Sequence, residues 1–113
     1  MSKLFLWFST FVWTNLILYL TTIPDFHPSG DTLLNWFISN GGHFFFFGVL
    51  AVLLKLDKLS NTHSLLLSSL YGLTIEFIQL NIPGRSFDLM DWALDTLGAI
   101  TFLFLFKKIQ SRL

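Results

Sequence analysis

The feature that most constrains this sequence is a set of long runs without charged side chains. Residues 4–24 contain none, and residues 32–54 contain none if His43 is neutral. A helix of about 20 apolar residues crosses the ~30 Å hydrocarbon layer of a membrane. A soluble fold of 113 residues could not cover the apolar surface of a chain that is 53% hydrophobic and 12% charged. The sequence therefore predicts an integral membrane protein.

Four transmembrane spans are predicted, at residues 4–24, 34–54, 64–82 and 89–106. The third is interrupted only by Glu76 and Gln79. The fourth carries Asp91 and Asp95, and we interpret it as a span because a bundle can shelter two acids, with a re-entrant segment as the alternative. The predicted fold class is all-α, a four-helix transmembrane bundle formed by residues 1–113 as a single domain.

Basic residues predict the orientation, because Lys and Arg are retained in cytoplasmic loops. If the four spans alternate, one side of the membrane receives Lys3, Lys55, Lys58, Lys107, Lys108 and Arg112. Arg85 alone lies on the other side. Both termini are therefore predicted to be cytoplasmic, with the 25–31 connection and the 83–88 turn outside.

Charge and cysteine content exclude several classes of function. Seven basic residues balance seven acidic ones, so nothing indicates a nucleic-acid partner. The chain has no cysteine, which excludes disulfides, thiolate metal sites and cysteine nucleophiles. The predicted partners are membrane lipids or a lipid-linked envelope precursor, and a chain this small could also form a homo-oligomer.

Ionisable residues from three spans fall at one depth. His43 is 11 residues from Leu54, Glu76 is 12 from Ser64, and Asp95 is 11 from Phe106. At 1.5 Å per residue, all three lie about 16–18 Å above the predicted cytoplasmic ends, near the middle of the membrane. The sequence therefore predicts a polar cluster inside the bundle.

Helical spacing predicts which faces meet. One stripe consists of Ser69, Gly72, Glu76 and Gln79, and a second consists of Asp88, Asp91, Asp95 and Gly98. A charged side chain that faces lipid costs about 2.5–3.5 kcal/mol, so both stripes should face inward, most simply each other. The short turn between the third and fourth spans makes them antiparallel neighbours.

Each candidate also has a structural interpretation. Glu76 and Gln79 could tie helices together through hydrogen bonds, and Asp88 could cap the fourth helix. His43 could be a neutral core histidine bonded to Ser39 or to a carbonyl group. Arg85 could simply pair with Asp88 or Asp91.

The motifs of residues 39–100 resemble those of the VanZ-like family. They are His43-Phe44, the E-x-x-Q of Glu76 and Gln79, the run Pro83-Gly84-Arg85-Ser86-Phe87-Asp88-Leu89-Met90-Asp91, and Thr96-Leu97-Gly98-Ala99. The chain departs from the family pattern in two places. Members typically carry Asp-Lys where this chain has Ser39 and Asn40, and they usually carry Asn where Asp95 stands.

The resemblance implies a multi-pass protein of the bacterial cytoplasmic membrane. The family is named for a component that lowers sensitivity to glycopeptide antibiotics of the teicoplanin type. No settled biochemical activity follows from the resemblance, so function has to be argued from the site.

The first hypothesis is a non-catalytic envelope protein whose outer-facing pocket binds a lipid or lipid-linked headgroup. Arg85 would hold an anionic group, and the other candidate ligand-binding residues are Gln79, Asp88 and Asp95. No cofactor is predicted. No metal is predicted either, because the sequence lacks an H-x-x-E-H-like spacing.

The alternative is a membrane-embedded enzyme that acts on a lipid-linked substrate. Glu76, His43 and Asp91 are its candidate catalytic residues, because two carboxyl groups in different environments can divide acid and base roles while a histidine shuttles protons. A proton or ion relay is a third hypothesis. A cluster that only specifies helix packing is the fourth.

Overall fold

The computed structural model describes residues 3–22, 32–83 and 87–112, and these form helices without any strand. The helices are α1 (Lys3–Thr22), α2 (Thr32–Leu56), α3 (Asn61–Gln79) and α4 (Leu89–Ser111). The predicted all-α fold with four helices is therefore confirmed. The predicted 25–31 connection lies outside the described residues.

Local sequence explains where the helices begin and end. Ser60 caps α3 by accepting a hydrogen bond from the backbone N–H of His63 at 3.1 Å. After α2, Lys58 adopts a left-handed φ of 79°, and the N–H of Leu59 returns to the carbonyl oxygen of Leu54 at 3.3 Å. The third helix ends at Gln79, three residues before the predicted limit of 82. Pro83 disfavours the helical conformation of the residue before it, so the helix cannot continue to that point.

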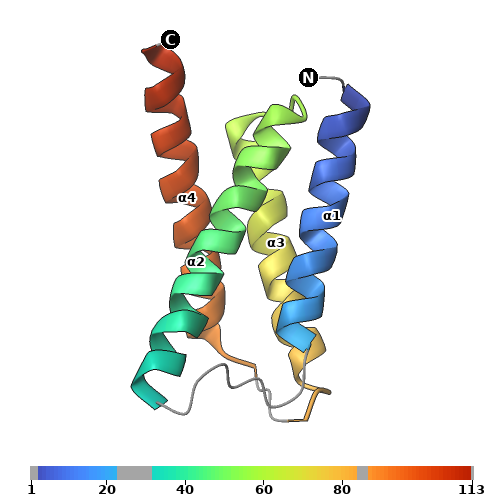
Figure 1. The fold of residues 1–113 in the computed structure, drawn as a ribbon, viewed down its shortest axis with the longest axis vertical. Coiled ribbons are helices and arrows are strands. Elements are labelled where there is room, and N and C mark those ends of the chain that lie inside the picture. The colour runs from blue at the N-terminus through green and yellow to red at the C-terminus, as the bar shows by residue number, and fades with distance from the viewer. Residues whose placement is uncertain (1–2, 23–31, 84–86, 113) are drawn as a thin grey trace.

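The helices run alternately along one long axis (Figure 1). The start of α1, the end of α4 and the α2–α3 connection lie at the same end of the bundle, as the alternating spans predicted. The opposite end, which we call the distal end, holds the end of α3 and the starts of α2 and α4. Assignment of the end that carries the termini to the cytoplasm stays a prediction.

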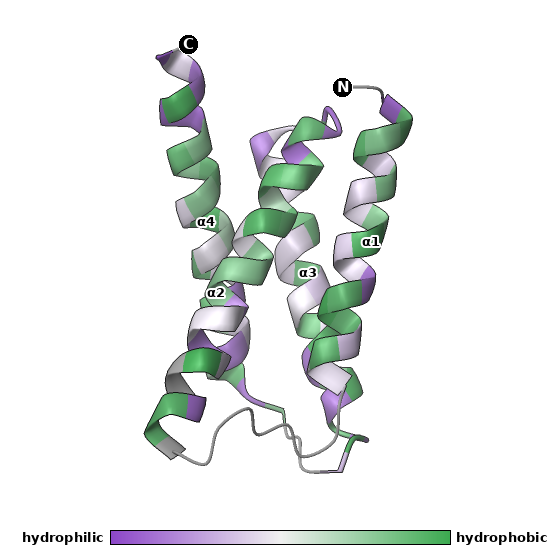
Figure 2. Ribbon diagram, viewed as in Figure 1, coloured by the Kyte–Doolittle hydropathy of each residue, from purple (hydrophilic) through white to green (hydrophobic). Residues whose placement is uncertain are grey.

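The surface of the bundle suits lipid. Figure 2 shows hydrophobic ribbon over most of α1, α2 and α4. Large apolar side chains stand exposed along these helices, among them Leu4, Phe8, Phe11, Leu33, Phe104 and Ile109. Within the described chain, three helical stretches are long and apolar enough to cross a membrane: residues 3–22, 33–56 and 89–111. A crossing by α3, which carries buried polar side chains, stays a prediction.

The most extensive helix contact in the described chain joins α2 to α4. A Cβ atom on Gly98 would collide with the backbone carbonyl of Phe44. The two helices therefore cross in direct backbone contact, which the missing side chain of Gly98 permits. Gly48 lies in the same way against the ring of Phe102. The short turn before α4 predicted only its contact with α3, which is also present.

The first helix completes the bundle by packing against α2 and α3. The indole N–H of Trp13 donates to the backbone carbonyl oxygen of Phe46 at 2.9 Å. The hydroxyl of Tyr71 donates to the backbone carbonyl oxygen of Thr14 at 2.6 Å. Such side-chain bonds to backbone replace the hydrogen bonds that lipid cannot provide.

We predict that Gly98→Ala lowers the free energy of unfolding by about 3 kcal/mol, because α2 and α4 must separate to admit the methyl group. Gly41→Ala is the matched control, since a Cβ atom there meets nothing within 4 Å. It should leave stability unchanged or raise it by about 1 kcal/mol. Denaturant titration in detergent micelles measures both values, and equal stabilities would contradict the described crossing.

Candidate functional site

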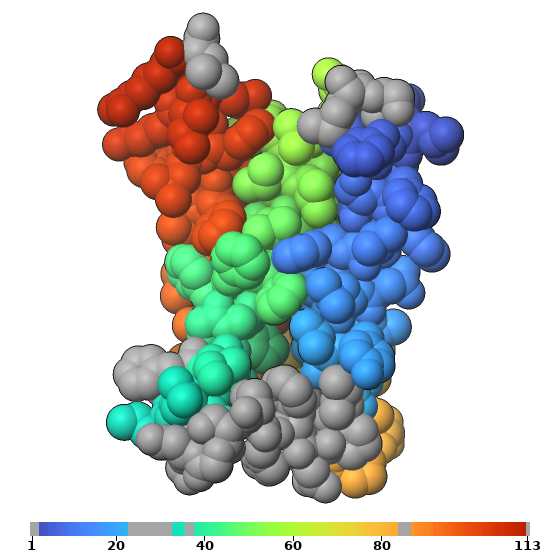
Figure 3. Space-filling view, viewed as in Figure 1, coloured from blue at the N-terminus to red at the C-terminus, as the bar shows by residue number. Residues whose placement is uncertain are grey.

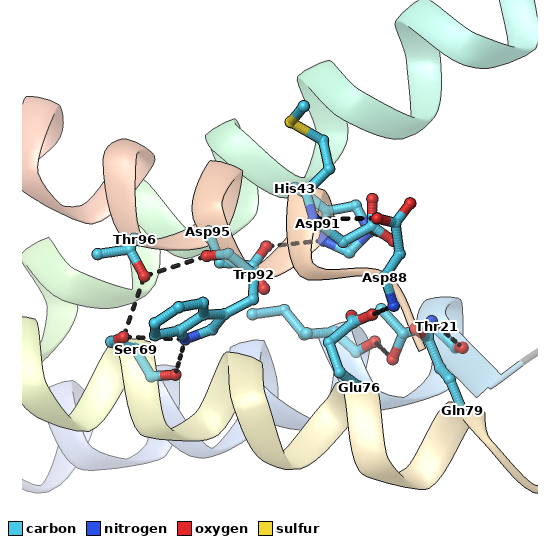
Figure 4. Close-up of polar contacts among 12 residues, drawn as sticks. Thr21, His43, Ser69, Glu76, Gln79, Asp88, Asp91, Trp92, Asp95 and Thr96 are labelled. Carbon is cyan, nitrogen blue, oxygen red and sulfur yellow. Dashed lines mark hydrogen bonds and ion pairs between the residues drawn. The ribbon is translucent and has the colours of Figure 1, made fainter. Parts of the chain in front are cut away.

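The centre of the site is a buried contact between His43 of α2 and Asp95 of α4 (Figure 4). The ring nitrogen Nδ1 lies 2.7 Å from Oδ1 of Asp95. The other nitrogen, Nε2, lies 3.5 Å from Oδ2 of Asp91. His43 is 9% exposed and Asp95 is fully buried, whereas the side chain of Asp91 is 17% exposed. The imidazole is therefore held between a buried carboxyl group and a partly accessible one.

The start of α4 supplies two further contacts. Asp88 caps this helix, because its Oδ1 accepts a hydrogen bond from the N–H of Met90 at 2.9 Å. Its own backbone N–H donates to Oε1 of Glu76 at 2.9 Å. The α3–α4 turn is therefore fastened to α3 through Glu76. Asp88 has the capping role that its position allowed, and its carboxyl group lies beside the cluster.

Two carboxyl groups of the site retain unused acceptors. Glu76 and Asp95 are both 0% exposed, yet Oε2 of the first and Oδ2 of the second have no hydrogen-bond partner in the described chain. Buried polar atoms are normally paired, and leaving a carboxyl oxygen unpaired in a membrane is costly. These atoms therefore provide sites for hydrogen-bond donors from outside the chain.

Glycine at position 72 makes room for Asp95. A Cβ atom on Gly72 would lie 2.6 Å from Oδ2 of Asp95, closer than real Cβ contacts. The carboxyl group of α4 thus rests directly against the backbone of α3. This contact joins the two stripes that the helical spacing predicted to face inward.

Gln79 lies at the edge of the site and ties α3 to α1. Its Nε2 donates to the carbonyl oxygen of Thr21 at 2.9 Å, and its Oε1 has no partner among the residues described. The amide group therefore forms the interhelical bond that the structural interpretation proposed, and it keeps one acceptor for another donor.

Sequence reasoning missed a polar network on the other side of Asp95. The indole N–H of Trp92 lies 3.1 Å from both the carbonyl and hydroxyl oxygens of Ser69, whose hydroxyl lies 3.0 Å from that of Thr96. The helical spacing had placed Ser69 on the inward stripe, but it gave no role to Trp92. Thr96 could have been placed beside this network from the sequence, because it lies one helical turn after Trp92 and therefore on the same face of α4.

An apolar cavity of about 170 Å³ lies between α1 and α2 in the distal half. These two helices meet along the face shown in Figure 3, where α2 lies between α1 and α4. The cavity is lined by Ile17, Leu20, Thr21, Ile38, Ser39, Gly42, His43, Phe46 and Phe47. His43 thus belongs both to the polar cluster and to the wall of the cavity. Ser39, which was considered as a partner of His43, lines this cavity, and the hydrogen bond goes to Asp95 instead.

Arg85, the predicted anion-binding residue, lies outside the described residues. Among the residues that the structure describes, no group of three or more His, Asp and Glu side chains could hold a metal ion.

Comparison with known proteins identifies a family. The family model described as VanZ/LLP1 matches residues 3–110, a longer stretch than the 39–100 region of the resemblance. No curated protein and no solved structure matches the chain.

We predict that Asp95→Leu lowers the free energy of unfolding by about 3 kcal/mol, because it leaves His43 buried without its partner. Asp95→Asn keeps an acceptor oxygen and should stay within about 1 kcal/mol of the wild type. Asp91→Ala removes a longer and more exposed contact and should also cost about 1 kcal/mol or less. Denaturation in micelles ranks the three variants, and a loss in Asp95→Asn as large as in Asp95→Leu would show that charge, rather than the hydrogen bond, holds the pair.

Proposed function

The chain belongs to the VanZ/LLP1 family, and from that premise we propose that it binds an amphiphile at the distal half of the bundle. The amphiphile is a membrane lipid or a lipid-linked envelope molecule. Its headgroup occupies the cluster around His43, and part of its hydrocarbon chain lies in the cavity between α1 and α2. This is a non-catalytic role, and it gives every part of the site a use.

One observation carries the proposal: His43 is shared by the polar cluster and the apolar cavity. A molecule that touches both surfaces at once must have a polar end and an apolar end, which is the definition of an amphiphile. The cavity volume of about 170 Å³ is below the ~300 Å³ of a pocket for a whole small molecule. It therefore suits a segment of one hydrocarbon chain, with the remainder in the surrounding lipid.

The chemistry of the cluster favours a headgroup that carries hydroxyl or amine hydrogens. The carboxyl groups of Asp91 and Asp95 contact a single imidazole, and that of Glu76 lies in the same cluster. Ionised carboxyl groups only accept hydrogen bonds, and Glu76 keeps one buried acceptor without a partner in the described chain. Arg85 would bind an anionic part of the same headgroup, as its position in the sequence predicts.

The cellular setting follows from the same proposal. We place the protein in the bacterial cytoplasmic membrane with four passes and cytoplasmic termini, so that the cluster opens toward the outer leaflet. By binding lipid or lipid-linked headgroups there, the protein would change which molecules a glycopeptide of the teicoplanin type can reach at the cell surface. Such an effect accounts for antibiotic tolerance without any reaction.

The enzyme hypothesis remains the second candidate because of one specific contact. The 2.7 Å bond between Asp95 and Nδ1 of His43 orients the ring and leaves Nε2 to accept or deliver a proton. A buried carboxyl group behind a histidine is the arrangement that general bases use in many hydrolases. Glu76 or Asp91 would then serve as the second proton-transfer group on a lipid-linked substrate.

We predict that native mass spectrometry of the mildly solubilised protein detects a bound lipid that Gly42→Leu displaces. Gly42 lines the cavity, and a Cβ atom there meets nothing within 4 Å, so a larger side chain can fill the cavity without disturbing the helices. Gly41→Leu is the matched control, because Gly41 also has free space but does not line the cavity. The control should keep the adduct.

The headgroup end is tested in the same experiment with Glu76→Gln and Arg85→Ala. Both variants should weaken the adduct, and Arg85→Ala should do so most for anionic headgroups. If all variants carry the same mixture of bulk lipids as the wild type, the proposed binding site is wrong. If Glu76→Gln and Arg85→Ala unfold instead, the cluster only holds the helices together.

The enzyme candidate makes a separate prediction. If His43 is a general base, His43→Gln lowers kcat on the substrate by about 10²–10⁴-fold while the protein stays folded. His63→Gln is the control, because His63 is exposed and bonds only to Ser60 in the described chain. Absence of turnover by the wild type on lipid phosphate monoesters, phosphate diesters and carboxylic esters would remove this candidate.

A further inference from the structure

A second polar feature runs along α3, below the cluster. Every fourth residue from position 64 lies on one buried stripe: Ser64, Ser68, Gly72 and Glu76. Both serines are 0% exposed, and neither hydroxyl has a hydrogen-bond partner among the described residues. The stripe therefore reaches from the His43–Asp95 contact toward the end of the bundle that carries the termini.

These serines differ from the other hydroxyl residues of the helices. A helical Ser or Thr usually donates to the carbonyl oxygen of the preceding turn. Thr74, on the exposed side of α3, does so with Leu70 at 2.9 Å, and Ser9 does so with Phe5 at 2.9 Å. The buried hydroxyls of Ser64 and Ser68 do not form this local bond or any other within the described chain, so their partners must come from elsewhere.

Asp95 fills the one level of the stripe where α3 has no side chain. Its Oδ2 rests against Gly72 and is itself without a partner in the described chain. One unpaired buried oxygen thus stands at each of four successive turns, on Ser64, Ser68, Asp95 and Glu76. Residues four apart on a helix are separated by about 6 Å along its axis.

Water can satisfy such oxygens. Its two hydrogen bonds, each about 2.8 Å long, are bent at the water, so one molecule bridges two oxygens that lie about 4–5.5 Å apart. Buried waters in proteins take this position, satisfying two or more polar groups that have no protein partner. An apolar ligand would leave all four oxygens unpaired.

We propose that the α3 stripe holds a file of buried waters, which conducts protons between the His43–Asp95 cluster and the terminal end of the bundle. The file begins near the α2–α3 connection, where Asp57 is buried with Oδ1 unpaired within the described chain. The proposal depends on α3 and not on the binding of an amphiphile.

The transfer balances without any co-reactant. A carboxyl group of the cluster releases a proton to the nearest water, each water accepts one proton and passes another on, and one proton leaves at the far end. The O–H bond that breaks at each step is replaced by one that forms on the next oxygen. Asp91, the partly accessible carboxyl group beside His43, exchanges protons with the distal side.

Cysteine substitution tests for water in the stripe, because the chain contains no cysteine of its own. Ser64→Cys and Ser68→Cys change one atom each, and Ala51→Cys and Ala99→Cys are controls that are equally buried but surrounded by apolar side chains. Silver ions are small enough to follow water. Added on the side of the termini in proteoliposomes, they should block the two stripe thiols and leave the controls free for maleimide labelling after denaturation.

Proton flux tests the function of the file. Vesicles that contain wild-type protein and a pH-sensitive dye should acidify faster than empty vesicles when a potassium gradient and valinomycin drive protons inward. Ser68→Val should reduce this flux to the level of empty vesicles, whereas Thr74→Val, which removes an exposed hydroxyl from the same helix, should keep it.

Either experiment can overturn the proposal. Stripe thiols as unreactive as those of Ala51→Cys and Ala99→Cys would show that the stripe is dry. Silver access without proton flux in the wild type would show that the waters are structural only. Flux that persists in a folded Ser68→Val protein would place the proton path elsewhere. Loss of lipid adducts in the mass spectra would contradict the amphiphile proposal alone.

Discussion

The contact between His43 and Asp95 is the interaction on which the interior of this bundle depends. Lipid offers no hydrogen bonds, so each polar group that enters the membrane must find its partner inside the protein. The pair meets because Gly98 lets α4 reach the backbone of Phe44, next to His43, and because Gly72 leaves room for the carboxyl group. The close helix packing and the His43–Asp95 contact therefore depend on each other.

Part of this arrangement could be predicted from the sequence. Uncharged runs set the helices, and the spacing of Glu76, Asp91 and Asp95 set the faces that point inward, because both follow from local periodicity. The α2–α4 contact, the cavity beside His43 and the bonding of Trp92 could not be predicted. They depend on how helices distant in the sequence tilt against one another, and a single sequence carries no signal for that tilt.

Structural and functional interpretations of the same residue prove compatible here. Asp88 caps α4 and also holds Glu76, and Gln79 ties α3 to α1 while keeping an acceptor free. Asp95 gives this chain a titratable partner for its histidine. A carboxyl group at this position can exchange a proton, whereas an amide can only hold a hydrogen bond.

The close crossing at Gly98 has a mechanical consequence. It lies near the middle of α4, so a tilt of this helix about the crossing would move its two ends in opposite directions while the crossing itself stays nearly fixed. In the described chain α4 makes no contact with α1, which leaves such a tilt unhindered on that side. Gly98 would be the pivot of such a tilt, which would move the carboxyl groups near the start of α4 and the lysines near its end in opposite directions.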